Sequence, residues 1–421
     1  MKKIRKIIIM FIIASMITGC GKSGEKNKQG KISENDYRRE LSSNEIESGK
    51  ASFYVEDKLK IDADITKQKL YKNGLKSYYQ KQYCETKIGT TNKFKNNPTV
   101  FHKNRKQIEK MLNQIIHGKL NYKEFVIEKD SENAPELDGV FSADNGSKYD
   151  CKTIWDTYNN ALGHSRFFFC PQFIMEKQGS DADAINAIKY MTETDIKVEK
   201  TKMLTEIEKN AKVYKNWLEK FIGTSLDDKY RIFELNKKTS KSLNDSELCD
   251  YKFKDKEYQM IMFYKKADEM AINNIDLSYV LKADEKPDKW AKTTMVRENL
   301  FTMTESPVYI IFCNGEIEYI EADIYRYMGE EYKNNQNIIS PNKILKKVIS
   351  FYEKELIVDE VCIKSINLEY AGYYGRGNNM VKPIFAPVWS VKVYDGEKKR
   401  MTYFVYDAVT GECYVNEYIP W

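Results

Sequence analysis

The sequence predicts an α+β fold in which modules of one helix packed on an antiparallel sheet follow one another along the chain. Helical and strand-like apolar patterns both occur and alternate in long blocks, and hairpin signals recur between the strands. Hydrophobic residues make up 42% of the 421 residues, which is enough for a sizeable core. A chain of about 400 residues has room for two or three domains.

The patterns divide the chain into five parts. The first two contain few strand or helix signals beyond an N-terminal apolar run, and the last three are globular in composition. The parts are a signal peptide (1–19), a lipidated cysteine with a flexible tether (20–48), an N-terminal α+β region (49–200), a middle helix-plus-sheet module (201–300) and a C-terminal module (301–421).

The N-terminus has the layout of a secretory signal. The basic stretch MKKIRK precedes IIIMFIIASMIT, an apolar run of about a dozen residues that is too short for a permanent membrane-spanning helix. The run ends at Ile17-Thr18-Gly19-Cys20, which resembles the bacterial lipobox. The resemblance implies cleavage before Cys20 and a diacylglyceryl group on its sulfur. The alternative is an ordinary signal peptide with an incidental cysteine.

The lipobox defines the expected location of the mature protein. One acyl chain anchors a protein only marginally, whereas two make the attachment durable. We therefore expect the protein on the outer face of the cytoplasmic membrane, with the membrane as a partner through Cys20. The residues that follow, up to about 48, are polar, and such a tether has a root-mean-square span on the order of 30 Å.

The Gly21-Lys22-Ser23 triplet after the lipobox is not a phosphate-binding loop. That motif needs a glycine five positions before Gly21, where the chain has Met16, and it needs a strand before it and a helix after it. Nucleic acid is not an expected partner either. The whole chain has 68 basic and 62 acidic residues, four of the basic ones lie in the signal, and the remaining charge of +2 is nearly neutral.

Helices and strands are expected throughout the middle of the chain. Residues 183–222 read as a long helical region whose second half has one apolar face. The stretches YRIFEL, CDYKFK and EYQMIMFY read as strands, with KDKE as a hairpin turn between the last two. Further expectations are a helix over RKQIEKMLNQIIHGK and a strand with Leu59, Ile61, Ala63 and Ile65 on one face.

The C-terminal part has the clearest signals. Asn314-Gly315 predicts a hairpin turn. The stretch SPNKILKKVISFYEKEL predicts a helix with Ser340 as its cap and Pro341 in its first position. Further strands are expected with Ile366, Leu368 and Tyr370 on one side, and hairpins with Asp395-Gly396 and Thr410-Gly411 in their turns.

Two C-terminal stretches carry a family resemblance. FAPVWSVKV followed by TYFVYDAVTGECY resembles the PepSY-type unit, a helix packed on a small antiparallel sheet. The wider stretch 295–415 resembles an uncharacterised family of lipoproteins from clostridia and related Gram-positive bacteria, whose ends are similar to the YycH/YycI regulatory lobes. Members of the YycH/YycI type act by protein contact, which implies an envelope protein as partner. The resemblance implies no catalytic residue or cofactor.

Local patterns predict no catalytic, metal or cofactor site. The chain has three histidines, His102, His117 and His164, with no H-E-x-x-H motif and no pair within one helical turn. His164 lies beside Ser165 and six residues before Cys170, but sequence adjacency does not place a nucleophile against a base.

The remaining motifs favour structural interpretations. The seven cysteines after Cys20 contain no C-x-x-C pair, and buried thiols are the favoured interpretation for strand positions such as Cys313 and Cys362. GYYGRGNN lacks the last glycine of a dinucleotide fingerprint, and DGVFSADNGSKYD lacks the order of a calcium loop. The tyrosine-rich runs YAGYYGRG and LKSYYQKQY read as sheet faces, with a recognition surface as the alternative.

These observations favour a non-catalytic role. We expect a lipid-anchored, extracytoplasmic protein that binds an envelope protein or a peptide in a regulatory or scaffolding way. An extracytoplasmic small-ligand-binding lipoprotein is the second hypothesis, with a Tyr- and Trp-lined cleft. A surface hydrolase with a site near His164 is the third.

Overall fold

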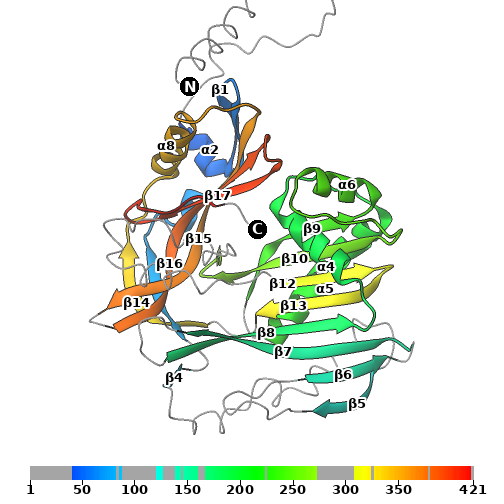
Figure 1. Ribbon diagram of the computed structural model, residues 1–421. Helices are drawn as coiled ribbons and strands as arrows, with labels where there is room; N and C mark the ends of the chain where they lie inside the picture. The colour runs from blue at the N-terminus through cyan, green and yellow to red at the C-terminus, as the bar shows by residue number, and fades with distance from the viewer. Residues whose placement is uncertain are drawn as a thin grey trace, which may run out of the picture. The chain divides into compact units, whose positions relative to one another are not determined.

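The computed structural model describes residues 40–81, 85–87, 120–126, 138–143, 146–159, 166–222, 225–272, 308–323, 327–377 and 380–418. These residues belong to one unit, Arg38–Trp421. They form two sheets, with mostly antiparallel pairing, and several helices (Figure 1). The predicted α+β class is therefore confirmed.

An eight-stranded sheet contains strands from both ends of the described chain. Its order is β1-β2-β15-β16-β17-β18, with β3 paired to both β16 and β14. The β2–β15 pair is parallel and the other pairs are antiparallel. The strands are β1 (Lys50–Glu56), β2 (Leu59–Ile65), β3 (Leu75–Lys81), β14 (Tyr327–Gln336), β15 (Val361–Gly377), β16 (Met380–Asp395), β17 (Arg400–Asp407) and β18 (Cys413–Tyr418).

A ten-stranded sheet takes up the middle of the chain. Its order is β11-β10-β12-β13-β8-β7-β6-β5, with β9 paired to β10 and β4 paired to β8. Its strands are β4 (Glu85–Lys87), β5 (Leu120–Val126), β6 (Asp138–Ala143), β7 (Lys148–Asn159), β8 (Arg166–Lys177), β9 (Leu226–Leu235), β10 (Tyr258–Ala267), β11 (Met270–Ala271), β12 (Val308–Cys313) and β13 (Glu316–Asp323).

The described chain has fewer helices than strands. None of the helices in the described ranges is both long and apolar enough to cross a membrane. They are α2 (Ser43–Ser48), the 3-10 turn η2 (Gln68–Leu70), α4 (Ala182–Tyr190), the 3-10 turn η4 (Met191–Glu193), α5 (Lys202–Ile222), α6 (Lys237–Asp245) and α8 (Pro341–Tyr352).

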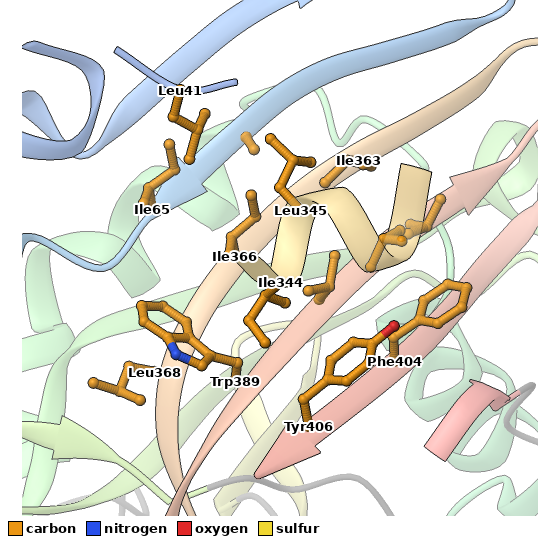
Figure 2. Close-up of a cluster of buried hydrophobic side chains, with 14 of the residues drawn as sticks. Leu41, Ile65, Ile344, Leu345, Ile363, Ile366, Leu368, Trp389, Phe404 and Tyr406 are labelled. Atoms are coloured by element: carbon orange, nitrogen blue, oxygen red, sulfur yellow. The ribbon is translucent and has the colours of Figure 1, made fainter. Parts of the chain in front are cut away.

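The core of the eight-stranded sheet lies under α8. Ile344 and Leu345 of the helix are fully buried, and Figure 2 shows them among strand side chains such as Ile366 and Phe404. Trp389 of β16 is also fully buried, and its indole N–H donates to the carbonyl oxygen of Ile339 at 3.1 Å. The apolar stripe of α8 therefore faces the sheet, as its spacing predicted.

The ten-stranded sheet is covered on both faces. One buried cluster joins its strands to α5, through residues such as Ile207 and Leu218. The other joins its strands to α4 and α6, through residues such as Ile188 and Leu243. Central strand β12 is buried at every position, as expected for a strand with helices on both sides.

Several C-terminal expectations are confirmed. Asn314 and Gly315 have φ values of 52° and 79° and form the turn between β12 and β13. Ser340 occupies the N-cap position of α8, with Pro341 following, although its side chain makes no capping hydrogen bond. The helix ends at Tyr352, four residues before the predicted end, because the backbone turns there through bonds from Lys354 and Glu355 to preceding carbonyls.

Two expectations for the middle of the chain are wrong. The helical region 183–222 is interrupted: Thr194 donates to the carbonyl of Met191, and Thr201 accepts from the amide of Leu204 to start α5. Threonine hydroxyls offer the backbone such alternative bonds. The stretch CDYKFK forms no strand and no hairpin over KDKE. The partners of β10 are β9 and β12 instead.

The sheets do not follow the boundaries drawn at residues 200 and 300. Strands β12 and β13 come from the C-terminal part but pair within the ten-stranded sheet, and β2 of the N-terminal region pairs with β15. The tether boundary at 48 is also too late. Leu41 is buried, and Ser42 and Glu45 form a capping box that starts α2. The helix predicted over RKQIEKMLNQIIHGK lies outside the described residues.

Candidate functional site

The predicted lipid-attachment residue Cys20 lies outside the described residues, as do His102, His117 and His164. The described chain begins at Glu40, 20 residues after Cys20.

The chain enters the folded body along α8. The backbone N–H of Leu41 donates to Asn342 Oδ1 at 2.7 Å, and Asn342 Nδ2 donates back to the Leu41 carbonyl at 3.0 Å. Lys346, one turn further along the helix, forms a 2.5 Å ion pair with Glu40. These contacts fix the start of the described chain on the N-terminal half of α8.

The segment after α8 exposes apolar side chains. We call residues Glu353–Glu360 the docking loop. Leu356 is 89% exposed and Val358 is 50% exposed, while Ile357 between them packs against the core. Burying a leucine or valine side chain is worth about 1.5–3 kcal/mol. Two such side chains directed away from the core are therefore available to a partner.

Hydrogen bonds hold the docking loop in place. Lys58 Nζ, in the β1–β2 turn, donates to the carbonyls of Val358 at 2.5 Å and Ile357 at 3.5 Å. The Glu360 carbonyl accepts from the Gly396 amide at 3.0 Å. A Cβ at Gly396 would lie 2.5 Å from that same carbonyl oxygen, so only glycine allows this close approach. The exposed apolar side chains thus sit on a fixed backbone.

Charge surrounds the exposed apolar side chains. The docking loop carries four carboxylates and one ammonium, a formal charge of −3, and all five side chains are exposed. Tyr54 Oη donates to Glu360 Oε2 at 2.9 Å. This bond, followed by burial, raises the pKa of Tyr54, so the phenol stays a donor at neutral pH. An acidic loop is repelled by an anionic membrane surface, so the loop suits a protein partner better than lipid.

The two tyrosine-rich runs meet on one carboxylate. Tyr78 of β3 and Tyr370 of β15 contact each other edge to face, with ring centroids 6.0 Å apart. Both hydroxyls donate to Asp268 Oδ2, that of Tyr370 at 3.2 Å. Burial raises the pKa of both phenols, and the bond to Asp268 adds to the rise. Both phenols therefore stay protonated at neutral pH. Through Asp268 the two tyrosines join strands of the two sheets.

A second polar group also joins the two sheets. Tyr403 of β17 donates to Glu193 Oε2 at 2.7 Å, and Lys364 of β15 forms a 2.7 Å ion pair with Asp195. Arg231 of β9 donates to the Thr192 carbonyl at 3.1 Å. Burial, followed by the Glu193 carboxylate, raises the pKa of Tyr403. These polar groups are bonded to one another, which indicates a structural role.

Two lysines on β8 and α4 neutralise acidic residues of β13. Lys177 bonds to Glu316 at 2.7 Å and to Glu318 at 3.2 Å, and Lys189 bonds to Glu321 at 2.6 Å. Burial lowers the pKa of Lys177, but the hydrogen bonds that its ammonium donates to the two carboxylates outweigh this effect and the net shift is upward. The Lys177 ammonium therefore stays charged and bonded, which does not suit a nucleophile or a general base.

Thiols and metal sites give no further candidate in the described part of the chain. Cys313 and Cys362 are buried and outside any disulfide, as the sequence indicated. Burial raises the pKa of both thiols, which makes them poor nucleophiles. Among the described residues, no group of three histidine, cysteine or acidic side chains is placed to hold a metal ion.

The docking loop could not be found from the sequence. The stretch EKEL continues the predicted helix SPNKILKKVISFYEKEL, and VDEV leads directly into the predicted strand position Cys362. The only signal was three consecutive apolar residues between acidic ones, a pattern equally typical of a buried turn. Knowing which of Leu356, Ile357 and Val358 points outward requires the path of the backbone.

Comparison with known proteins identifies no family. No family model matches the chain, and no curated protein matches it. Among solved structures, the chain is similar to an uncharacterized protein from Eubacterium rectale ATCC 33656, with 17% identity and a TM-score of 0.47 over 89% of this chain and 98% of that one. A similarity at this level carries no inference about function.

Proposed function

We propose that this chain is a lipid-anchored protein of the outer face of the cytoplasmic membrane that binds a protein or peptide partner and does not catalyse a reaction. The lipobox-like end at Cys20 supports the anchor. The docking loop supports the binding role, and the single observation that carries it is the exposure of Leu356 and Val358 on a backbone fixed from several sides. The resemblance to the YycH/YycI regulatory lobes, whose type acts by protein contact, agrees with this role.

The anchor is tested by replacing the lipidated residue. In Cys20→Ala, the sulfur that would carry the diacylglyceryl group is absent, so we expect loss of acyl labelling and of membrane retention of the mature chain. Metabolic labelling with a fatty-acid analogue and membrane fractionation measure both. A Cys20→Ala chain that is still acylated and membrane-bound would show that the lipobox interpretation is wrong.

The binding role is tested by crosslinking in intact cells. A photoreactive benzoylphenylalanine at position 356 should form an adduct with a discrete protein, because Leu356 is 89% exposed on the docking loop. The same group at Val213, which is 58% exposed on α5, is the matched control. Adding Val358→Asp should reduce the position-356 adduct at least threefold by making the apolar pair polar.

Two results would count against the binding role. One is the absence of any protein adduct at position 356. The other is an adduct of equal yield and identity at positions 356 and 213, which would indicate random collision with abundant neighbours.

A further inference from the structure

We propose that the open edge of β1 pairs with the same edge of a second copy of this chain, so that two copies form a symmetric dimer through a continuous sheet. Strand β1 pairs with β2 along one edge, and no described strand pairs with its other edge. The proposal concerns this edge alone and is independent of the partner that the docking loop would bind.

The register of β1 shows which backbone groups face outward. Ile65 N–H donates to the Gly49 carbonyl at 2.9 Å, and Ala51 and Phe53 follow Gly49 at the two-residue spacing of hydrogen-bonded pairs in an antiparallel ladder. The N–H and C=O groups of Ser52 and Tyr54 therefore point away from β2. Four backbone groups are available for a neighbouring strand.

The sequence of β1 is self-complementary when read against itself. Antiparallel pairing about a two-fold axis at Phe53 places Ser52 opposite Tyr54 of the partner subunit. Those two positions are the outward-facing ones, so the pairing forms all four hydrogen bonds at once. The same register sets Lys50 opposite Glu56 of the partner subunit, which brings opposite charges together twice.

The ends of the edge limit the pairing to this register. Ser48 Oγ lies 3.4 Å from both the N–H and the C=O of Lys50 and bonds to each, which closes the strand's N-terminal end. At the other end the pairing with β2 shifts register between Tyr54 and Glu56. A slip of two residues would direct the partner strand at groups that are already bonded.

Another edge strand of the described chain is protected in a way that β1 is not. Strand β9, which among the described strands pairs only with β10, carries half-buried Asp227 and exposed Asp228 and Lys229 along its first half. Charges in the middle of an edge prevent pairing with another sheet. Strand β1 carries its charges only at Lys50 and Glu56, which are the positions that meet in the proposed dimer.

A charge swap tests the proposal on the full lipidated chain in detergent micelles, by sedimentation over a range of protein concentrations. We expect a monomer–dimer equilibrium for the wild type. Lys50→Glu places a carboxylate opposite Glu56 of the partner subunit at both ends of the pairing, and this repulsion should weaken the dimer at least tenfold. The double variant K50E/E56K restores opposite charges and should return the dimerisation constant to within threefold of the wild type.

A backbone variant tests the hydrogen bonds separately. Ser52→Pro removes one outward N–H while leaving the β1–β2 bonds intact, and it should weaken the dimer at least tenfold. Ser52→Thr keeps the N–H and should dimerise like the wild type. Far-UV circular dichroism verifies that each variant is folded.

Three results would overturn the proposal. They are a wild-type chain that stays monomeric, a K50E/E56K variant as weak as K50E, and a folded Ser52→Pro variant that dimerises like the wild type. A register test complements them: cysteines at 52 on one copy and 54 on another should form an oxidised crosslink at least fivefold faster than two cysteines at 52. Equal rates would also contradict the pairing.

Discussion

Replacing Leu41 by alanine tests whether the folded body begins at the end of the tether. Leu41 is 4% exposed and packs in the core under α8 (Figure 2). Core Leu→Ala changes cost roughly 2–5 kcal/mol, and a site at the chain's entry can partly collapse, so we expect about 2–3 kcal/mol. The control is Leu356→Ala, the same change at an 89% exposed site, which should cost less than about 0.5 kcal/mol.

Thermal unfolding followed by circular dichroism measures the difference. Unfolding entropy grows with chain length, so for a unit of nearly 400 residues the Leu41→Ala change corresponds to a fall in Tm of roughly 3 °C. Asn342→Ala, which removes both hydrogen bonds to the Leu41 backbone, should also lower the Tm. If Leu41→Ala and Leu356→Ala have the same Tm, the residues before 49 contribute nothing to the stability of the folded unit, and the predicted tether boundary at 48 is correct.

Three further changes probe single contacts. Lys189→Met leaves Glu321, whose side chain is 9% exposed, without its cation and should lower the free energy of unfolding in a urea titration by about 2–3 kcal/mol. Adding Glu321→Gln in the same chain should recover at least half of that loss. No recovery would contradict the pairing. Gly396→Ala should lower the Tm through its clash with the Glu360 carbonyl, and a neutral result would refute the close approach. Burial raises the pKa of Glu318, so the folded state binds this proton more tightly than the unfolded state, and the stability that this gives is lost as the pH rises through the folded pKa. The stability of Glu318→Gln relative to the wild type should therefore increase between pH 4 and 7. A stability difference that does not change with pH would contradict this.

The sequence predicted elements whose signals are local. The turn at Asn314-Gly315 requires a left-handed backbone that asparagine and glycine adopt readily, so the dipeptide alone identifies it. Helix α8 has an apolar stripe, a proline in its first position and strand segments on both sides. The alternation of Leu59, Ile61, Ala63 and Ile65 likewise matches their burial in β2. In each case the physics that forms the element acts over a few neighbouring residues.

The arrangement of the sheets could not be predicted in the same way. Strands β2 and β15 pair in parallel across about 300 residues of chain, and nothing in either strand specifies the other. The stretch CDYKFK has β-forming residues, yet both edges of β10 are already paired, to β9 and β12, so CDYKFK cannot form the expected hairpin with β10. Tertiary pairing decides such cases over local propensity.

The candidate site combines one feature with a local sequence signal and one that depends on contacts distant in the chain. The lipobox-like pattern is a local signal along the chain, so the sequence alone can propose Cys20 for lipidation, and this stays a prediction because Cys20 lies outside the described residues. The docking loop depends on Lys58 and Gly396, which are about 300 and 40 residues away in the chain and hold the loop through backbone carbonyls. Backbone contacts of this kind leave no side-chain pattern in the loop itself.

The proposed dimer and the proposed anchor are geometrically compatible. Strand β1 starts nine residues after Leu41, where the tether enters the fold. In an antiparallel β1–β1 pair, the starts of the two seven-residue strands lie at most about 23 Å apart, since a strand rises about 3.3 Å per residue. The flexible tether that the sequence predicts spans about 25 Å over 20 residues, so both ends of the proposed anchor would reach one membrane without stretching. Confinement to that membrane raises the effective concentration of each copy for the other, so a four-bond edge that pairs weakly in solution would pair more completely on the cell surface.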